Sequence, residues 1–349
     1  MKINTYLILF SLLLILVATE GGCNYRSGKA IMQKSGPERY VNVFADSILA
    51  KNLDKISESV RKVNCYADYR TYVFDEKSKM VSSGLSDEAI FSKALASITS
   101  HEAVSGTATV IYSDSTHVAL LTCDHVVNFP DTVISYFETG DFEANKYIQS
   151  ISLKEKQQVI VYGLPEGGKI EVLLSDRYLD FAILGKAYEF ANITVPVFDF
   201  NVGKSTRLEW GSYLYLFGYP LGQLMITSGM ASKSSTPGEQ FIIDALFNEG
   251  FSGGIVLALS NNSHIPELIG IGRSVSARSE YILKPEKENY EISYNPKIPY
   301  KGEAFVKLRK DINYGITYVV PIEKISDLYR KNRPVLLQKG INLDSFFSR

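Results

Sequence analysis

Cysteine and histidine are scarce in this sequence, with three cysteines and four histidines among 349 residues. No group of them has the spacing of zinc ligands, so we expect neither a metal nor another cofactor. Cys65 and Cys123 could form a disulfide in an oxidising compartment, and the sequence leaves open whether their Cα atoms come close enough. The net charge is only −1, which removes the electrostatic case for binding nucleic acid.

Proline is also sparse, with 12 residues against 22 tyrosines and 18 phenylalanines. Because aromatic residues are enriched in strands, this balance favours β structure. Hydrophobic residues make up 45% of the chain and charged residues 21%, which is ordinary for a globular protein. The length is sufficient for one large domain or two small ones.

The beginning of the chain has the pattern of an export signal. Lys2 supplies a positive charge, residues 6–17 are apolar, and two glycines precede Cys23. The apolar run is shorter than a membrane span requires. A cysteine here resembles the acylated cysteine of bacterial lipoproteins, although Glu20 stands where such sites usually have leucine. We expect residues 1–22 to be a signal peptide. The mature protein would be a membrane-anchored lipoprotein of the bacterial cell envelope or, alternatively, periplasmic or secreted.

Two helices are predicted after this signal. Residues 23–36 are polar and are expected to be a tether. Residues 37–63 carry apolar side chains at helical spacing, which predicts a helix packed on the rest of the protein; a helix for a membrane or a partner is the alternative. Ser86, followed by two acidic residues, predicts the N-cap of a helix over residues 86–98. Residues 37–99 are therefore expected to be a helical N-terminal extension.

From residue 104 onward, short β-branched and aromatic runs alternate with turn residues, which predicts an all-β domain over residues 100–335. Residues 277–311 differ, because they are rich in Lys, Glu, Tyr and Pro. They are predicted to be a surface insertion, either a solvated loop or hairpin or a lid that faces the substrate. A helix is expected over residues 323–331, and residues 336–349 would form a C-terminal tail.

Three residues that could form a nucleophilic triad, His125, Asp180 and Ser252, each stand beside a strand-like apolar run. A serine hydroxyl is a weak nucleophile at neutral pH and needs an adjacent base, which His125 would supply. Asp180 would hold the imidazole tautomer. The glycines around Ser252 allow a tight turn in which the backbone amides of Gly250 and Ser252 could bind an oxyanion. Each residue alone is more often structural, but the three together predict a catalytic triad.

The order His, Asp, Ser is that of chymotrypsin-type serine proteases, and further motifs resemble the HtrA/Deg type. The similarity extends over residues 100–335. The segments that carry it are residues 104–111, 213–222, 227–232, 268–272 and 314–322. The resemblance implies two six-stranded antiparallel β-barrels with the active site in the cleft between them. It also implies a serine endopeptidase that acts on proteins or peptides, without the PDZ domain that many relatives carry.

The sequence departs from this family in several places, among them Ile255, where a proline is common. Phe251 stands where the family usually has Asn or Asp, which leaves open how the oxyanion loop is held. The spacing from His125 to Asp180 is long for the family, and residues 137–168 are expected to contain an extra hairpin or loop. The residues that would line the pocket for the P1 side chain are Leu246, Gly272, Arg273 and Ser274. Because no acidic residue stands in that pocket, we expect an apolar P1 residue.

Other functions remain to be weighed against a protease. A catalytically weak or inactive protein that binds peptides in the same cleft is the main alternative, favoured by Phe251 and by the long insertion. An esterase is disfavoured, because Ser252 lacks the strand–serine–helix context of the α/β-hydrolases.

Overall fold

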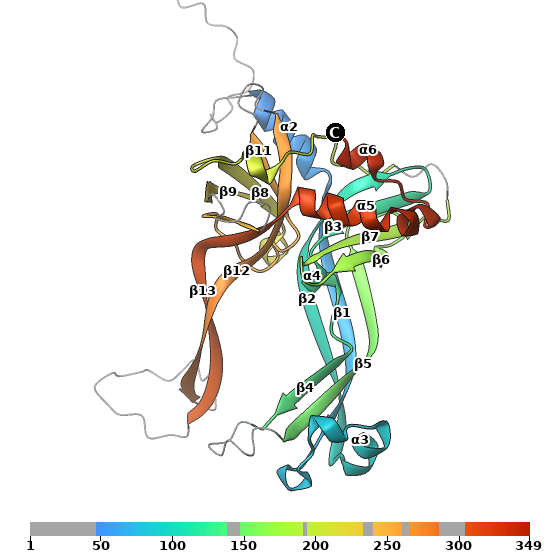
Figure 1. Cartoon of the computed structure of the whole chain (residues 1–349), viewed down its shortest axis with the longest axis vertical. Helices are drawn as coiled ribbons and strands as arrows, with labels where there is room; N and C mark the ends of the chain where they lie inside the picture. The colour runs from blue at the N-terminus through green and yellow to red at the C-terminus, as the bar shows by residue number, and fades with distance from the viewer. Residues whose placement is uncertain (1–46, 138–146, 191–193, 233–239, 260–264, 286–303) are drawn as a thin grey trace, which may run out of the picture. The chain divides into compact units, whose positions relative to one another are not determined.

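A computed structural model describes residues 47–137, 147–190, 194–232, 240–259, 265–285 and 304–349 (Figure 1). These residues all belong to one unit, residues 46–349. The predicted signal peptide, the tether and the first part of the predicted N-terminal helix lie outside the described residues.

Six antiparallel strands close a first barrel in the order β1–β2–β3–β7–β6–β5, and β5 pairs back onto β1. The strands are β1 (Val60–Val73), β2 (Ala96–Ser113), β3 (His117–Thr122), β5 (Ile148–Val161), β6 (Lys169–Asp176) and β7 (Phe181–Ala187). A further strand, β4 (Thr132–Tyr136), pairs with β5 outside this ring. Residues 137–168, predicted to contain an extra hairpin or loop, include β5, and β4 just before them adds a pairing with β5 beyond the barrel.

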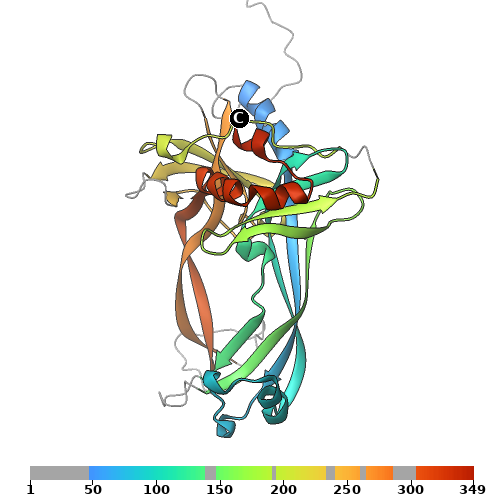
Figure 2. The same ribbon diagram turned by 45° about the vertical axis from the view of Figure 1, so that its right-hand side comes forward.

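The other six strands close a second barrel in the order β10–β13–β12–β11–β8–β9. The strands are β8 (Tyr213–Gly218), β9 (Met225–Ser232), β10 (Phe241–Ile243), β11 (Ile255–Leu259), β12 (Pro266–Pro285) and β13 (Ala304–Pro321). Figure 2 shows the two barrels from a second side. The prediction of an all-β protein with two six-stranded antiparallel barrels is confirmed.

Alternating residues of the second barrel belong to two different hydrophobic clusters. Leu216 and Val256 lie in the cluster inside the second barrel, whereas Phe217, Ile255 and Leu257 belong to the large cluster of the first barrel. Successive side chains of a strand point to opposite faces of the sheet. One face of β8 and β11 therefore fills the second barrel, and the other face packs the two barrels together.

The N-terminal helix ends earlier than the sequence predicts. Within the described residues, α2 (Ser47–Ser57) buries Leu49 and Ile56 against the first barrel, as expected for a packed amphipathic helix. The prediction that this helix continues to residue 63 is wrong, because Val60 and Val63 belong to β1. Their three-residue spacing fits a helix, but pairing with β2 and β5 makes the segment a strand. Residues 37–99 thus also contain a strand of the first barrel.

The second predicted helix begins where expected. Ser86 Oγ accepts a hydrogen bond from Ala89 N at 3.1 Å and caps α3 (Asp87–Lys93). The helix ends five residues earlier than Ile98, because Ala96 already begins β2. The remaining short helical segments are η1 (Glu76–Ser78), η2 (Ser82–Gly84), α4 (Asp124–Val127), η4 (Ser205–Arg207) and η5 (Pro220–Gly222).

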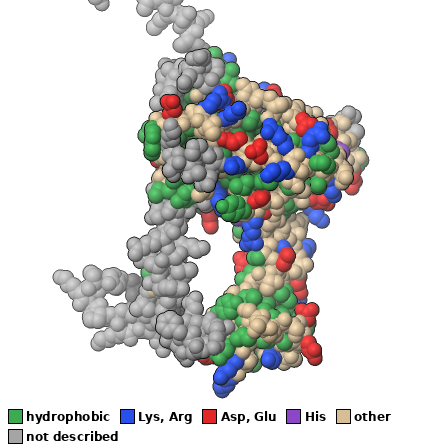
Figure 3. Space-filling view, viewed as in Figure 1, with side chains coloured by type: hydrophobic (Ala, Val, Ile, Leu, Met, Phe, Trp, Pro, Cys, Tyr) green, Lys and Arg blue, Asp and Glu red, His purple; other side chains and the backbone are tan. Residues whose placement is uncertain are grey.

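Two ribbons extend from the barrels. β1, β2 and β5 continue together to a small cluster that contains Phe74, Met80, Ile90 and Ile148. Figure 3 shows hydrophobic side chains gathered at the far end of this ribbon. In the second ribbon, β12 pairs with β13 from Ala277↔Ile312 to Pro285↔Ala304. The predicted insertion is therefore a β-hairpin, of which residues 286–303 lie outside the described residues.

The C-terminal helix is longer than predicted. It is α5 (Ile322–Gln338), and α6 (Asp344–Phe347) follows it. Arg333 Nη2 contacts Asp344 Oδ2 at 2.5 Å, and Phe346 is buried in the large cluster. The predicted tail is thus packed on the protein. None of the helices in the described part of the chain is long and apolar enough to cross a membrane.

Candidate active site

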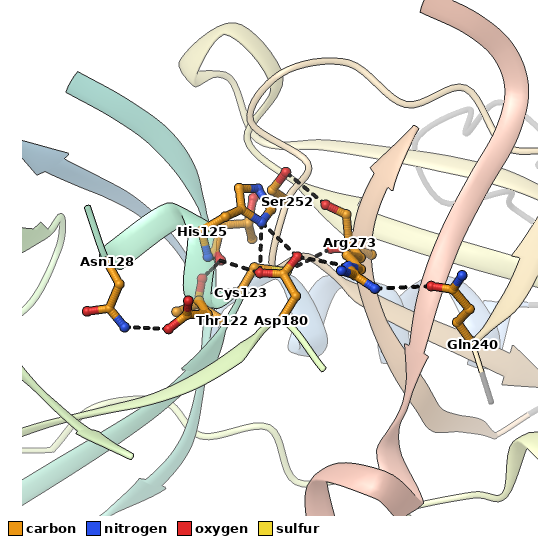
Figure 4. Close-up of polar contacts among 11 residues, drawn as sticks. Thr122, Cys123, His125, Asn128, Asp180, Gln240, Ser252 and Arg273 are labelled. Carbon is orange, nitrogen blue, oxygen red and sulfur yellow. Dashed lines mark hydrogen bonds and ion pairs between the residues drawn. The ribbon is translucent and has the colours of Figure 1, made fainter. Parts of the chain in front are cut away.

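The fold brings the three residues of the predicted triad to the ends of strands. His125 is the second residue of α4, which follows the end of β3 after the single residue Cys123. Asp180 lies in the turn between β6 and β7, where its φ is 61°. Ser252 lies in the loop between β10 and β11 of the second barrel. Figure 4 shows the three residues close together, with Arg273 beside them.

His125 and Asp180 form a tight pair. Their contacts are Nδ1 to Oδ2 at 2.8 Å and Nδ1 to Oδ1 at 2.9 Å, and the His125 backbone amide also donates to Oδ1 at 2.9 Å. An ionised carboxylate can only accept, so Nδ1 carries a proton and Nε2 is left as the acceptor. Asp180 is 6% exposed, whereas the His125 side chain is 44% exposed. The buried carboxylate thus fixes the imidazole ring through Nδ1 and leaves Nε2 free to react.

The environment keeps Asp180 ionised. Burial alone would raise the pKa of the Asp180 carboxyl, but hydrogen bonds from His125 and the nearby charge of Arg273 outweigh burial and lower that pKa. A carboxylate that stays charged stabilises an imidazolium next to it. This electrostatic arrangement suits a histidine that accepts a proton during a reaction.

The Ser252 hydroxyl is turned toward the second barrel. Its Oγ donates to the backbone carbonyl of Arg273 at 3.3 Å. Among the described residues, it has no hydrogen bond to His125. In unliganded enzymes such contacts are often long and tighten only when substrate binds. A reaction at Ser252 therefore requires the hydroxyl to leave this weak acceptor and turn to Nε2 of His125.

The loop around Ser252 depends on glycine at two positions. Gly250 has φ 102°, and a Cβ there would lie 2.3 Å from the Tyr219 carbonyl oxygen. Gly253 has φ 82°, and a Cβ there would lie 2.2 Å from the Thr107 carbonyl oxygen. Among the described residues, the backbone amides of Gly250 and Ser252 have no hydrogen-bond partner. These two amides are therefore available to a ligand oxygen.

Thr107 of the first barrel anchors this loop. Its Oγ1 donates to the Gly250 carbonyl at 2.6 Å and accepts from Tyr219 N at 2.8 Å, and its backbone amide donates to the Ser252 carbonyl at 2.8 Å. Thr107 is fully buried. Sequence reasoning placed this residue in a family-like strand but assigned it no role. The one signal was a threonine directly after glycine in that strand.

Phe251 takes no part in a polar anchor. It is 2% exposed, and its ring lies 5.8 Å from that of Phe247 in the cluster inside the second barrel. A Cβ on Gly218 would collide with it, so the glycine makes room for the ring. Hydrophobic burial of Phe251 and the hydrogen bonds of Thr107 together answer how the loop is held.

The residues predicted for the P1 pocket differ in burial and in their contacts. Gly272 is buried and holds the serine loop, since its carbonyl accepts from Gly253 N at 2.8 Å. Arg273 Nε contacts Asp180 Oδ2 at 3.2 Å, which sequence reasoning did not foresee. Leu246 is 60% exposed in the loop between β10 and β11. The side chain of Ser274 lies outside the described ones.

One group of potential metal ligands exists in the described part of the chain. The ligand atoms of Cys123, His125 and Asp180 lie within 4.8 Å of one another. However, burial raises the pKa of the Cys123 thiol well above its ordinary value, and the thiol donates to the Gly272 carbonyl at 3.3 Å. Metal binding requires the thiolate, and the Arg273 cation already contacts Asp180. These contacts favour a hydrogen-bonded cluster over a metal site.

The two described cysteines are free and buried. Cys65 donates to the Val127 carbonyl at 3.6 Å, and burial raises the pKa of its thiol to about 11. Cys65 and Cys123 therefore form no disulfide in this structure.

Comparisons with known proteins gave a partial likeness to solved structures. No family model matches the chain, and no curated protein matches it either. An HtrA-type protease, an AlgW variant with a decapeptide, has a TM-score of 0.44 and 16% identity, covering 82% of this chain and 67% of that one. The same protease with a tripeptide has a TM-score of 0.41 and 17% identity, covering 81% and 63%. The chain thus spans about two thirds of the length of these structures.

Proposed function

We propose that the protein is a serine endopeptidase with a trypsin-like fold and with His125, Asp180 and Ser252 as its catalytic triad. The observation that carries the proposal is the buried Asp180 carboxylate, which holds both Nδ1 and the backbone amide of His125. An ordinary His–Asp ion pair on the surface needs no second contact to a buried carboxylate. A catalytic histidine needs such contacts, because they fix the ring so that Nε2 points in one direction.

The proposed reaction runs through an acyl-enzyme. His125 Nε2 takes the proton from Ser252 Oγ while this oxygen bonds to the carbonyl carbon of the scissile peptide. The amides of Gly250 and Ser252 bind the resulting oxyanion. His125 then gives its proton to the leaving amine, and the C–N bond breaks. Water attacks the ester in the same way, with His125 as base, and releases the new carboxylic acid and the free Ser252 hydroxyl.

The substrates would be proteins or peptides bound between the barrels, as the neighbouring structures contain peptides. We propose an apolar P1 residue, because Leu246 is an apolar residue near the serine loop and no acidic residue was found at the predicted P1 positions. Cleavage profiling with a peptide library tests this preference.

Export and acylation at Cys23 are also proposed. They rest on the apolar run of residues 6–17 and on the two glycines before the cysteine. The protein would then act outside the cytoplasm of a bacterial cell, held to a membrane by its lipid.

A fluorophosphonate probe tests the catalytic proposal. The probe should label Ser252 in the wild-type protein, Ser252→Ala should take up none, and His125→Ala should be labelled orders of magnitude more slowly. Casein hydrolysis should disappear in both variants. The second candidate, an inactive protein that binds peptides, is favoured by the Ser252 hydroxyl contacting the Arg273 carbonyl in place of His125. Folded wild-type protein that binds peptides but takes up no probe would establish this candidate.

A further inference from the structure

A pocket with three cationic side chains lies beside Asp180. Its volume is about 450 Å³, and Arg177, Arg273 and Lys324 all line it. Gln240 and Tyr178 add polar groups, and no carboxylate is found among its described lining residues. The pocket draws on the turn before Asp180, on β12 and on the first turn of α5. It is thus formed by both barrels and the C-terminal helix.

The three cationic side chains keep donors that no described protein group accepts. Arg273 uses Nε for Asp180 and Nη1 for Gln240, each at 3.2 Å, as Figure 4 shows. A guanidinium has five N–H donors, so three remain. Neither the Arg177 nor the Lys324 side chain has an ion pair or hydrogen bond within the described part of the chain. Arg177 is exposed, whereas Arg273 and Lys324 are half-buried.

Three acidic residues that stand next to lining residues in the sequence already have hydrogen-bond partners. Asp180 is held by His125 and Arg273. Glu323, next to Lys324 on α5, accepts from the backbone amide and the hydroxyl of Ser205. Asp176 accepts from Leu179 N at 2.8 Å. Hydrogen bonds do not cancel these negative charges, but none of the three carboxylates is among the described lining residues, whereas three cations are. Like charges in the lining repel one another until an anion enters.

We propose that this pocket binds an anionic group of the carboxylate or phosphate class. Its ligand is recognised by Lys324, Arg177 and the free donors of Arg273. One source of the anion is an acidic side chain of a peptide substrate, and this assignment rests on the proposed protease function. The other source is a free small anion. In both cases the ligand binds next to the triad, because Arg273 contacts the pocket and Asp180 at once.

Two arms of one experiment test the pocket and separate the sources. In the first arm, kcat/KM is measured for peptide pairs that differ only by Glu or Gln at P2, P3 or P4. In the second, inorganic phosphate and glutarate are titrated into the Ser252→Ala protein at low ionic strength. Both arms compare wild-type pocket residues with the Arg177→Gln/Lys324→Gln double variant. Lys331→Gln is the matched control, because this exposed lysine lies on the same helix outside the pocket.

We expect kcat/KM to be about 10-fold higher for the Glu peptide than for the Gln peptide at one position, or a free anion to bind. The double variant should weaken either effect about 5-fold or more. Lys331→Gln should change neither. Anion binding without a Glu preference supports the pocket and assigns it to a free ligand. Equal cleavage of Glu and Gln peptides, together with no binding of phosphate or glutarate, overturns the proposal. Failure of fluorophosphonate labelling would count against the protease function alone, since the second arm needs no catalysis.

Discussion

Replacing Thr107 with valine tests how the two barrels hold the candidate oxyanion loop. The substitution keeps the branched shape and removes the hydroxyl. Two groups then lose their partner, namely the Gly250 carbonyl at 2.6 Å and the Tyr219 amide at 2.8 Å. No water can replace the hydroxyl easily, because Thr107 is fully buried.

The expected cost is large for a single hydroxyl. A buried polar group left unpaired costs about 1–3 kcal/mol, and two such groups are involved. Since Tyr219 is only half-buried, we expect a loss of about 2–4 kcal/mol in the free energy of unfolding. For a chain of this size, that corresponds to a fall of about 3–6 °C in Tm. The loop that carries the Gly250 amide also loses the anchor at its Gly250 carbonyl, so fluorophosphonate labelling of Ser252 should slow about 100-fold.

Thr109 provides a matched control on the same strand. It is also fully buried, but its Oγ1 has no hydrogen-bond partner among the described residues. Thr109→Val should therefore leave Tm unchanged or raise it, and labelling should proceed at the wild-type rate. Thr107→Ser, which keeps the hydroxyl, should restore most of the labelling. Equal losses in Thr107→Val and Thr109→Val would refute the reasoning, because the cost would then come from packing and not from the two hydrogen bonds.

Three further predictions concern other parts of the chain. An alanine in the left-handed region costs about 1–2 kcal/mol. Gly250→Ala should cost more than this and abolish labelling, whereas Gly211→Ala, at φ 83° with open space around it, should cost only this amount. Denaturant unfolding measures both. Burial alone would raise the pKa of Asp114, but hydrogen bonds from Tyr112, Thr116 and His117 lower it to about 2 from 3.8. Its stabilising effect is then present above about pH 4 and lost as pH falls toward 2, so the Tm difference between wild type and Asp114→Asn should shrink over that range. Cys23→Ser should release the protein from membranes with its peptidase activity intact, and an unmodified mass for the mature wild-type protein would contradict acylation.

The parts of the site that depend on local pattern were predictable. Each triad residue stands beside a strand-like run, and a glycine loop around serine is visible in the sequence without any structure. Alternation of turn residues with short apolar runs also identified the β-rich domain. The helix predicted through Val63 shows the limit of this reasoning. Val60 and Val63 fit a helical period as well as a strand, and only pairing with β2 and β5 distinguishes the two.

The contacts that hold the site together are not local, which is why sequence reasoning missed them. Thr107 and Gly250 are 143 residues apart, and Asp180 and Arg273 are 93 apart. Both pairs join one barrel to the other, so they exist only after the two sheets have closed and packed through the faces of β8 and β11. A threonine in a strand and an arginine after glycine carry no local sign of such partners. The position of Ser252 relative to His125 therefore depends on the packing of the barrels, and buried substitutions at that junction should affect labelling of Ser252 before they unfold the protein.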